Sequence, residues 1–509
     1  MMRPLDAILN KITMYRLVLY ELIFLILVAG ILGFFHLVPY DPLYIGYSVV
    51  IIFAIAWIVN RAFAYFYDAP SNPESTYITA LILVLIIAPP HAFNDFNFLA
   101  LAGWAAAWSI ASKYIFAIGQ KHLCNPAALG VAVTALFLNQ SATWWIGTLW
   151  MLPFVAVGGF LIAHKIRRVG MVIVFGVALV ATILILSSGE GTGAFHIVQA
   201  SLLYTPAVFL GTVMLTEPFT TPSTRFLRFY YAIIVGFLFA PEVHIGSFYF
   251  TPELALLAGN LFVYVVSPKV KLFLTLKDRL QIAENTYEFV FSSNRKLSFS
   301  PGQYLEYTLA HSNADSRGIR RYFTIASSPT DSDFRVGVKF YQPMSSFKRT
   351  LLSMKMGETL VASQLAGDFV LPSDKKKKLV FIAGGIGITP FRSMLQHLLD
   401  TNDRRDITLL YSNNTMSDIA YMPLITQAER ELGLVTLPIL TNQPLGDSKV
   451  EGIPSVISEQ LIAKEIPDYQ DCLFYLSGPQ AMVTAYSDLL SRLKIPKRHV
   501  KKDYFPGFA

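Results

Sequence analysis

The sequence predicts a multi-domain protein in which a polytopic α-helical membrane domain precedes two domains of ordinary globular composition. The 509 residues are 54% hydrophobic with a mean hydropathy of +0.48, which is too apolar for an ordinary soluble chain. The charge-poor runs are confined to residues 1–268. Beyond them, β-rich runs over 269–376 predict a six-stranded antiparallel barrel, and alternating β and helical runs over 377–509 predict a doubly wound α/β domain.

The net charge is +7, from 41 basic and 34 acidic residues. The sequence has no basic stripe with interleaved aromatic residues, so nucleic acid is not an expected partner. Two cysteines, Cys124 and Cys472, are too few for a disulfide framework or a four-thiolate iron–sulfur cluster. The first apolar run is too long for a signal-peptide core, so it is expected to stay in the membrane.

Hydropathy predicts about ten crossings. They are placed at residues 15–38, 44–66, 76–90, 98–119, 126–138, 145–164, 169–187, 197–216, 226–240 and 251–267. Lys and Arg flank alternate connections, whereas the opposite ones, around 38–43, 91–97, 188–196 and 241–247, contain neither. By the positive-inside rule, the chain is a multi-pass protein of the cytoplasmic membrane, surrounded by lipid, with both termini and the globular part in the cytoplasm.

Two predicted spans are too short to cross a hydrocarbon core of about 30 Å at about 1.5 Å per residue. One begins at Asn125-Pro126 and ends at Leu138, and the other begins at Thr251-Pro252. Each opens with a capping residue and a proline in its first turn. They are the fifth elements of two five-span halves, which indicates an inverted repeat with interrupted helices that can face an anionic or polar guest. The alternative is that proline merely starts two short helices.

Three segments of this half resemble one family of membrane proteins. They are Lys121–Gly130 (KHLCNPAALG), Met214–Pro222 (MLTEPFTTP) and Thr79–Pro90. Across residues 40–268 the chain is similar to the flavin-carrying membrane components of two redox pumps, the sodium-translocating NADH:quinone reductase and the Rnf complex. The resemblance implies FMN or riboflavin within the membrane domain, and it makes Asn125 a candidate cofactor contact.

That family commonly carries an FMN esterified to the threonine that ends a Ser-Gly-Ala-Thr motif. Gln140-Ser141-Ala142-Thr143 is the matching place: Ala142 and Thr143 agree, Ser141 replaces the glycine, and the usual upstream acidic residue is missing. The predicted topology puts Thr143 on the outer face, where a flavin transferase could reach it. The tryptophan pair that follows would otherwise be an ordinary interfacial belt.

The segment from Thr216 to Thr224 is expected on the cytoplasmic side. Its hydroxyls, Glu217 and its prolines could hold a second flavin or a quinone head group, or could form a rigid turn. A bis-histidine haem relay is disfavoured, because the histidines of this half fall at or near span ends and no predicted helix carries two. No metal-ligating residues are predicted.

The globular part begins with six β-rich runs, at 270–276, 288–292, 304–309, 321–326, 335–341 and 359–363. Four buried runs follow, at 379–383, 407–411, 436–440 and 472–477, alternating with helical stretches. The first of these four runs into Gly384-Gly385-Ile386-Gly387-Ile388-Thr389-Pro390 and then a helix through Leu399. Such a glycine turn lets a pyrophosphate approach the backbone at a helix N-terminus.

The stretch Arg320–Pro329 (RRYFTIASSP) offers a cation for a pyrophosphate, aromatic rings at Tyr322 and Phe323, and a short hydroxyl at Thr324. With the glycine turn and Ser477-Gly478-Pro479, this stretch makes residues 270–509 resemble the ferredoxin–NADP reductase superfamily. The resemblance implies that Arg321 binds the FAD pyrophosphate. It also implies that Tyr322 packs on the isoalloxazine and that the Thr324 hydroxyl approaches flavin N5.

The same resemblance implies further contacts. Ser345 and Ser346 match the second pyrophosphate contact at a helix start, and Ser477 stands where the family often has a cysteine that orients the nicotinamide. The nicotinamide dinucleotide would be cradled by Gly384, Gly385, Gly387, Thr389, Pro390, Gly478 and Pro479. Near the chain end, Phe505 or Phe508 could lie over the flavin face or could pack against the barrel.

The cofactor preference follows from a missing charge. Thr441-Asn442-Gln443-Pro444 has no cation where NADP-preferring relatives place Ser-Arg, so NADH is favoured over NADPH. No plant-type ferredoxin cysteine set is fused to the chain. Electrons from FAD would therefore pass directly to the membrane part or through a partner.

The sequence thus predicts an NADH-dependent flavin oxidoreductase that passes electrons through FAD and membrane flavin to an extracytoplasmic acceptor or a quinone. Two alternatives stay open. One is NADH:quinone reduction without an outward path. The other is a transporter of a small solute or cation with a redox-sensing reductase domain, which an inverted repeat permits.

Overall fold

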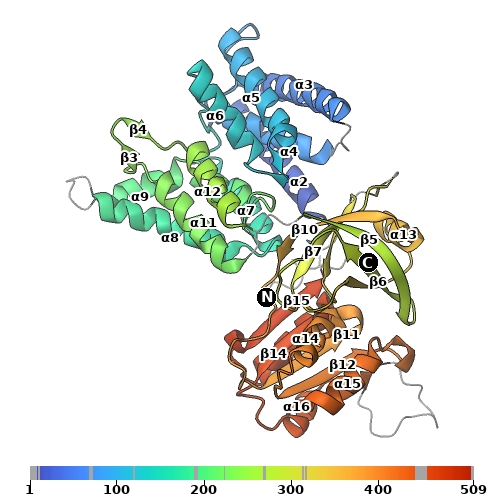
Figure 1. Ribbon diagram of the computed structural model, residues 1–509. Coiled ribbons are helices and arrows are strands. Elements are labelled where there is room, and N and C mark those ends of the chain that lie inside the picture. Colours follow the sequence, from blue (N-terminus) through green and yellow to red (C-terminus); the bar gives the residue numbers. More distant parts are fainter. Residues whose placement is uncertain are drawn as a thin grey trace. The chain divides into compact units, whose positions relative to one another are not determined.

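The computed structural model describes residues 9, 12–67, 73–118, 121–187, 193–222, 224–267, 271–311, 314–315, 318–441 and 455–505. The chain divides into two compact units, Met1–Ser267 and Pro268–Ala509, which are treated separately (Figure 1). The first unit is helical apart from two short hairpins, and the second contains two large sheets.

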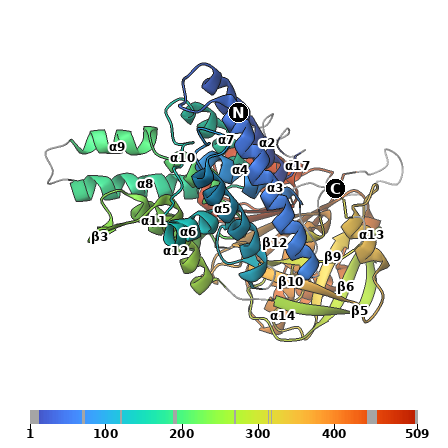
Figure 2. The ribbon, with the colours of Figure 1, turned by 90° about the horizontal axis from the view of Figure 1, so that it is seen from above.

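Helices occupy each of the ten ranges that hydropathy marked in the first unit. They are α2 (Met14–Phe34), α3 (Pro42–Phe66), α4 (Pro73–Ile86), α5 (Phe96–Ile115), α6 (Pro126–Leu138), α7 (Leu152–Lys165), α8 (Val169–Leu186), α9 (Ala194–Leu203), α10 (Ala207–Phe209), α11 (Arg225–Phe239) and α12 (Pro252–Val266), with a π-helical turn η2 (Leu210–Met214). The hairpins are β1–β2 (Ala117–Ile118 and Lys121–His122) and β3–β4 (His244–Ile245 and Phe248–Tyr249). Helix α2 runs beside α3, and α8 lies along α9 (Figure 2).

Length and composition support fewer crossings than the ten expected. Among the described residues, α2, α3 and α8 are long and apolar enough to cross a membrane, and a fourth span results if the bent pair Phe195–Leu203 and Ala207–Met214 is counted as one. Helices α4, α6, α7 and α12 are shorter apolar helices. Helix α4 is the buried centre of the unit: every residue from Thr79 to Ile86 is buried. A helix that is apolar on all sides is typical of such a position.

The two halves of the first unit differ at positions where they were expected to match. Asn125 caps α6 as predicted, since its Oδ1 accepts the Ala128 N–H at 3.1 Å. Thr251 occupies the matching N-cap position of α12 as predicted, but among the described residues its buried hydroxyl has no hydrogen-bond partner, and Glu253 is the acidic residue of the first turn. The element expected over 197–216 is not one helix either. It bends by 65° before Ala207, where Pro206 interrupts the helical hydrogen bonds.

The barrel sheet of the second unit contains six antiparallel strands, as predicted. They are β5 (Lys271–Ala283), β6 (Thr286–Ser293), β7 (Tyr304–Thr308), β8 (Arg320–Thr324), β9 (Phe334–Lys339) and β10 (Thr359–Ala366), in the order β8-β7-β10-β5-β6-β9. Helix α13 (Ser346–Ser353) connects β9 to β10. Side chains such as Phe289, Leu305 and Val336 fill the barrel core, because alternate residues of each strand point inward, and Phe347 of α13 packs against them.

The second sheet is parallel and has helices on both faces. Its strands are β11 (Leu379–Gly384), β12 (Ile407–Asn413), β13 (Val435–Leu440), β14 (Leu473–Pro479) and β15 (Val500–Phe505), in the order β13-β12-β11-β14-β15. Helices α14 (Thr389–Asp400) and α15 (Met422–Leu432) pack on one face, and α16 (Glu459–Glu465) and α17 (Gln480–Arg492) on the other. The doubly wound prediction is confirmed. It missed β15, whose residues had been interpreted only as an aromatic chain end.

Candidate functional site

The Arg321 side chain and the start of α13 converge on a single carboxylate. Arg321 Nη2 lies 3.4 Å from Asp315 Oδ1, and the Ser346 N–H donates to Asp315 Oδ2 at 3.0 Å. Ser345 caps the same helix by accepting the Lys348 N–H at 3.2 Å. A guanidinium and a helix N-terminus both attract anions, and here the anion that they share is the Asp315 carboxylate. The residues that the resemblance assigned to the FAD pyrophosphate are therefore brought together.

Strand β8 divides its side chains between two faces. Tyr322 is 49% exposed, and its ring meets Tyr304 edge-to-face at 5.7 Å. Thr324, two residues on, shares the face of Tyr322 and is buried. Phe323 points the other way, into the barrel core, where its ring lies 5.9 Å from Phe347. Tyr322 and Thr324 thus share one face of β8, whereas the Phe323 side chain lies on the opposite face.

The glycine turn lies where the parallel sheet reverses its order. The chain passes from β11 through the 3-10 turn η3 (Gly385–Ile388) directly into α14. The next strand, β12, lies on one side of β11, and the later strand β14 lies on the other. Ligands of open α/β sheets bind at the carboxyl ends of the strands on either side of such a reversal. Thr389 and Pro390 form the first turn of α14, so their backbone faces this crevice.

Close backbone contacts explain the glycines. A Cβ at Gly387 would lie 2.4 Å from the Ser477 carbonyl oxygen, and one at Gly384 would lie 2.2 Å from Met482 Sδ. Gly478 has φ +155 and its Cα lies against Gly384. The ends of β11 and β14 can approach this closely only without side chains. Gly385 has φ +51 and no atom near its missing Cβ, so it leaves open space at the turn.

Ser477 provides a polar group beside these glycines. Its side chain is fully buried, and its hydroxyl has no hydrogen-bond partner among the residues that the structure describes. A buried hydroxyl without a partner is costly unless a ligand satisfies it. Ser477 therefore fits a contact with the nicotinamide amide, as the resemblance implied.

Strand β15 adds an acidic residue that the sequence interpretation overlooked. It pairs in parallel with β14, which places Asp503 opposite Ser477 and the Phe505 backbone opposite Pro479. Burial raises the pKa of the Asp503 carboxyl to about 6. The side chain of Phe505 and the whole of Phe508 lie outside the described residues. The pairing of β15 with β14 places Asp503 beside Ser477, although 25 residues lie between them in the sequence.

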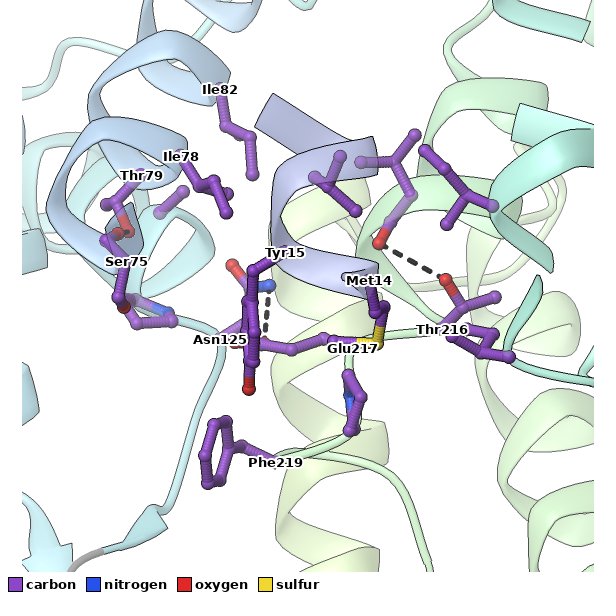
Figure 3. Close-up of a pocket in the computed structure, with 17 residues that line it drawn as sticks. Met14, Tyr15, Ser75, Ile78, Thr79, Ile82, Asn125, Thr216, Glu217 and Phe219 are labelled. Carbon is purple, nitrogen blue, oxygen red and sulfur yellow. Dashed lines mark hydrogen bonds between the residues drawn. The ribbon is translucent and has the colours of Figure 1, made fainter. Parts of the chain in front are cut away.

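A cavity in the first unit is lined by Asn125, Thr216 and Glu217, three of the four candidate residues of this unit (Figure 3). It contains about 60 Å³ of water-accessible space and is lined from α2, α4, α6, α7, η2 and the turn after η2. Tyr15 and Phe219 stack at its mouth with ring centroids 6.4 Å apart. The volume is below the roughly 300 Å³ of pockets that enclose a whole ligand, so this conformation admits a ring edge or a head group.

Glu217 is the acidic residue that lines this cavity. Its Oε2 accepts hydrogen bonds from Asn125 Nδ2 at 2.9 Å and from Thr220 Oγ1 at 3.0 Å. The Asn125 N–H donates in turn to Asn260 Oδ1 of α12 at 2.8 Å. Thr216 is fully buried and binds back to the Thr212 carbonyl at 2.6 Å. The fifth helices of both halves therefore meet beside one buried carboxylate, which the sequence suggested without showing the contact.

Residues 143–146 close the C-terminal end of α4. The Trp144 N–H donates to the Ile86 carbonyl at 2.8 Å, and Trp145 Nε1 donates to the Val84 carbonyl at 2.9 Å. Both tryptophans are 5% exposed, so their interpretation as an interfacial belt is wrong. Thr143 itself is exposed, and its hydroxyl makes only a long contact of 3.4 Å to Ile86.

The family of oxidoreductase NAD-binding domains matches residues 381–488. A flavohemoprotein of Oceanobacillus iheyensis is 24% identical over 212 residues, covering 41% of this chain and 52% of that protein. The glycine betaine monooxygenase reductase subunit of Chromohalobacter salexigens is 25% identical over 211 residues, covering 41% and 56%. The chain spans about half the length of the curated relatives it matches. Among solved structures, Amycolatopsis cytochrome P450 reductase GcoB aligns with a TM-score of 0.41 at 22% identity, over 47% of this chain and 71% of that one.

Residues 381–488 are therefore an oxidoreductase-type NAD-binding domain, and 212 residues of the chain are similar to part of a flavohemoprotein.

Proposed function

We propose that the protein is a single-chain, multi-pass membrane NADH dehydrogenase with its reductase module in the cytoplasm. Electrons from NADH would pass through FAD to flavin in the membrane unit and from there to an extracytoplasmic acceptor. The observation that carries the proposal is the pairing, in one chain, of a reductase module with a helical unit whose interrupted helices meet at a polar cavity.

In the reductase module, each candidate residue has a separate task. Arg321 and the N-terminus of α13, with Ser345 and Ser346, would hold the pyrophosphate after Asp315 gives way. Tyr322 and Thr324 would contact the ring, and Ser477 would orient the nicotinamide. When bound, FAD accepts a hydride as an electron pair and can release the electrons singly. Loss of FAD from an Arg321→Ala protein, measured by its visible spectrum, would test this assignment.

NADH is proposed as the donor because Thr441-Asn442-Gln443-Pro444, which directly follows β13 in the sequence, contains no cation. Asn442 to Pro444 lie outside the described residues. Without a cation, the 2′-phosphate of NADPH would lose a charge-assisted hydrogen bond of about 1.5–3 kcal/mol. We expect kcat/KM for NADH to exceed that for NADPH by at least about tenfold. Equal values would contradict the proposed preference.

In the membrane unit, the cavity around Glu217 would hold the edge of a flavin ring. Asn125 and Thr216 place polar atoms around it, and Tyr15 and Phe219 place aromatic faces at its mouth. The apolar helices would form about ten crossings, with α4, α6, α7 and α12 as short or interrupted spans. Cysteine labelling at the 91–97 and 241–247 connections, from outside only, would test this topology.

Thr143 is the proposed site of covalent FMN. Its exposure leaves the hydroxyl open to a flavin transferase, and the hydrogen bonds of its neighbours to α4 hold the segment in place. The denatured protein should therefore show flavin fluorescence on a gel, and Thr143→Ala should abolish it. Serine, which also has a hydroxyl, provides a matched variant at the same position. Absence of fluorescence from the wild-type band would remove this step from the path.

The decisive experiment uses sealed vesicles with NADH inside and an impermeant acceptor outside. Reduction of the outer acceptor, together with more than one flavin per chain in the spectrum, would support outward electron transfer. FAD alone and no outer reduction would contradict it.

NADH:quinone reduction without an outward path is the second candidate. The size of the cavity favours it, because about 60 Å³ flanked by Tyr15 and Phe219 suits a quinone head group. Quinone reduction in the same vesicles, without reduction of the outer acceptor, would select this function.

A further inference from the structure

A buried charged cluster joins the flavin-side barrel to the nicotinamide-side helix α14. Its centre is Arg392, which is 8% exposed and lies one turn into α14. Arg392 Nη1 donates to the Ala326 carbonyl at 2.9 Å and to Asp331 Oδ2 at 3.0 Å. Its Nε lies 4.0 Å from Glu288 Oε1. All three partners belong to the barrel, so one side chain of the nicotinamide domain contacts three places on the flavin domain.

The next residue strengthens the same link. Ser393 is fully buried, and its hydroxyl donates to the Ser327 carbonyl at 2.6 Å. Two consecutive residues of α14 therefore bind the carbonyls of two consecutive barrel residues, Ala326 and Ser327. These carbonyls belong to the segment that continues from β8, two and three residues after Thr324. Ala326 is also held from behind, since its N–H donates to the Arg335 carbonyl at 2.8 Å.

The position of Arg392 makes the link relevant to the reaction. Helix α14 begins at Thr389, directly after the glycine turn that would receive the dinucleotide, and Arg392 is three residues further. On the other side, Thr324 is two residues before Ala326. A rigid helical turn and a short extended segment thus connect the two ends through one guanidinium. Any tilt of α14 would move the nicotinamide relative to the flavin.

We infer that Arg392 is a positioning residue that, with Ser393, sets the distance between the nicotinamide and the flavin ring. This inference rests on the reductase half of the proposed function and is independent of the membrane path. Arg392 touches neither cofactor in this assignment. It acts through the Ala326 carbonyl and the Asp331 carboxylate, which fix the segment carrying Thr324.

The cluster is arranged so that Arg392 can be replaced without leaving a bare buried charge. Glu288 keeps Arg335, whose Nη1 lies 2.6 Å from Glu288 Oε2. Asp331 keeps the Ser328 N–H at 3.0 Å. Breaking a buried pair is severe mainly when a charge is left alone. An Arg392→Gln protein is therefore expected to fold and to keep its FAD.

The test is anaerobic stopped-flow reduction of the FAD of the full-length protein by NADH. In Arg392→Gln, the limiting rate at saturating NADH should fall by about 10- to 100-fold, because a displacement of about 1 Å can cost that much. The dissociation constant for NADH should change less than about threefold, since the glycine turn is intact. NADH deuterated at the transferred position should show an isotope effect at least as large as in wild type. Arg392→Lys, which keeps the charge but not the planar fork, should be intermediate.

Lys339→Gln is the matched control. Lys339 of β9 pairs with Asp418 of η4 (Met416–Asp418), so it is a second, largely buried ion pair between the same two domains. It does not contact the segment after β8, and its loss should leave the limiting rate within about twofold of wild type. Equal slowing in Lys339→Gln would show that any loosening of the interface suffices and would overturn the inference.

An Arg392→Gln protein with normal FAD content and a wild-type limiting rate would also overturn the inference that Arg392 positions the nicotinamide. If that variant does not fold, Ser393→Ala removes one bond of the same link, and an unchanged limiting rate there would count equally against the inference. Failure of the membrane path would leave all these rates untouched, so the two ideas can fail separately.

Discussion

The glycine turn of the second unit and the cavity of the first unit are built in opposite ways. The turn is a place without side chains, where a Cβ at Gly387 would meet backbone atoms of β14. The cavity is a place where polar side chains enter an apolar core, with Glu217 held by Asn125 and Thr220. The shape of the turn thus depends on missing side chains, whereas the cavity depends on one hydrogen-bonded carboxyl group. A small substitution in the turn should therefore impair function by steric conflict, and one in the cavity by loss of hydrogen bonds.

The largest effect is expected from Gly387→Ala. One added methyl would lie 2.4 Å from the Ser477 carbonyl oxygen, so β11 and β14 must separate where the nicotinamide would bind. We expect NADH-dependent FAD reduction to fall by at least about 100-fold, measured anaerobically at saturating NADH.

Gly433→Ala is the control for backbone strain. Gly433 has φ +75, nothing lies within 4 Å of its missing Cβ, and it ends α15 away from the turn. Its replacement should lower the free energy of unfolding by about 1 kcal/mol and leave NADH kinetics normal. Wild-type rates in Gly387→Ala would mean that shape is not what defines the turn.

Glu217→Gln tests the site defined by charge. Glutamine keeps the volume but removes the carboxylate that Asn125 and Thr220 hold. FAD reduction by NADH should be unchanged, whereas electron transfer onward to quinone or an outer acceptor should fall by at least about tenfold, because hydrogen bonds to charged groups are worth about 1.5–3 kcal/mol.

Glu253→Gln is the matched carboxylate in the other half. Glu253 is 1% exposed and accepts the Trp144 indole N–H at 2.8 Å, so it is already satisfied within the protein. Onward transfer in this variant should stay within about twofold of wild type. If Glu217→Gln and Glu253→Gln slow onward electron transfer equally, the cavity around Glu217 has no specific role in that transfer.

Trp144→Phe should destabilise the first unit without touching the cavity. The change removes the indole N–H that donates to Glu253 Oε2. Among the described residues, this buried carboxylate oxygen is then left without a hydrogen bond. We expect a loss of about 2 kcal/mol in the free energy of unfolding in detergent. A double-mutant cycle with Glu253→Gln should give a coupling of about 1 kcal/mol, and zero coupling would contradict the pairing.

Asp503→Asn is expected to have the smallest effect, and it tests the carboxyl group that strand pairing places opposite Ser477. Because burial raises the pKa of Asp503 to about 6, its ionisation in the folded protein opposes folding. Wild-type stability from this group is fully present below the unfolded pKa near 4 and is lost as pH rises through about 6. The variant should be more stable than wild type by about 1 to 2 kcal/mol at pH 7.5 and should lack this pH dependence between pH 4 and 7. Parallel melting curves of both proteins over that range would contradict the assignment.

The helices and most strands could be predicted because their signals are local. Charge-poor runs mark α2 to α12, and β-rich runs mark β5 to β14. Strand β15 was missed because Lys501, Lys502 and Asp503 interrupt its apolar pattern, as is common for edge strands. The bend before Ala207 was missed because hydropathy does not register the direction of a helix.

The site was predictable only where its residues form motifs. Arg321 to Thr324 and Gly384 to Thr389 are each continuous in sequence, so their binding roles could be predicted from the motif alone. Asp315, Asp503 and Arg392 act through contacts made by the fold. Arg392 in particular looks like the polar face of an amphipathic helix until the Ala326 carbonyl is found beside it.

The π-helical turn η2 decides where Glu217 points. It covers Leu210–Met214, directly before Thr216 and Glu217. A π-turn carries one residue more than the α-helical path it replaces, and each helical residue rotates the chain by about 100°. If the same residues instead followed the regular α-helical path, the segment after them would be rotated by about 100°, and the Glu217 carboxyl group would turn away from Asn125. The direction of the Glu217 carboxyl group thus depends on the helical phase of η2 as well as on the residues that line the cavity.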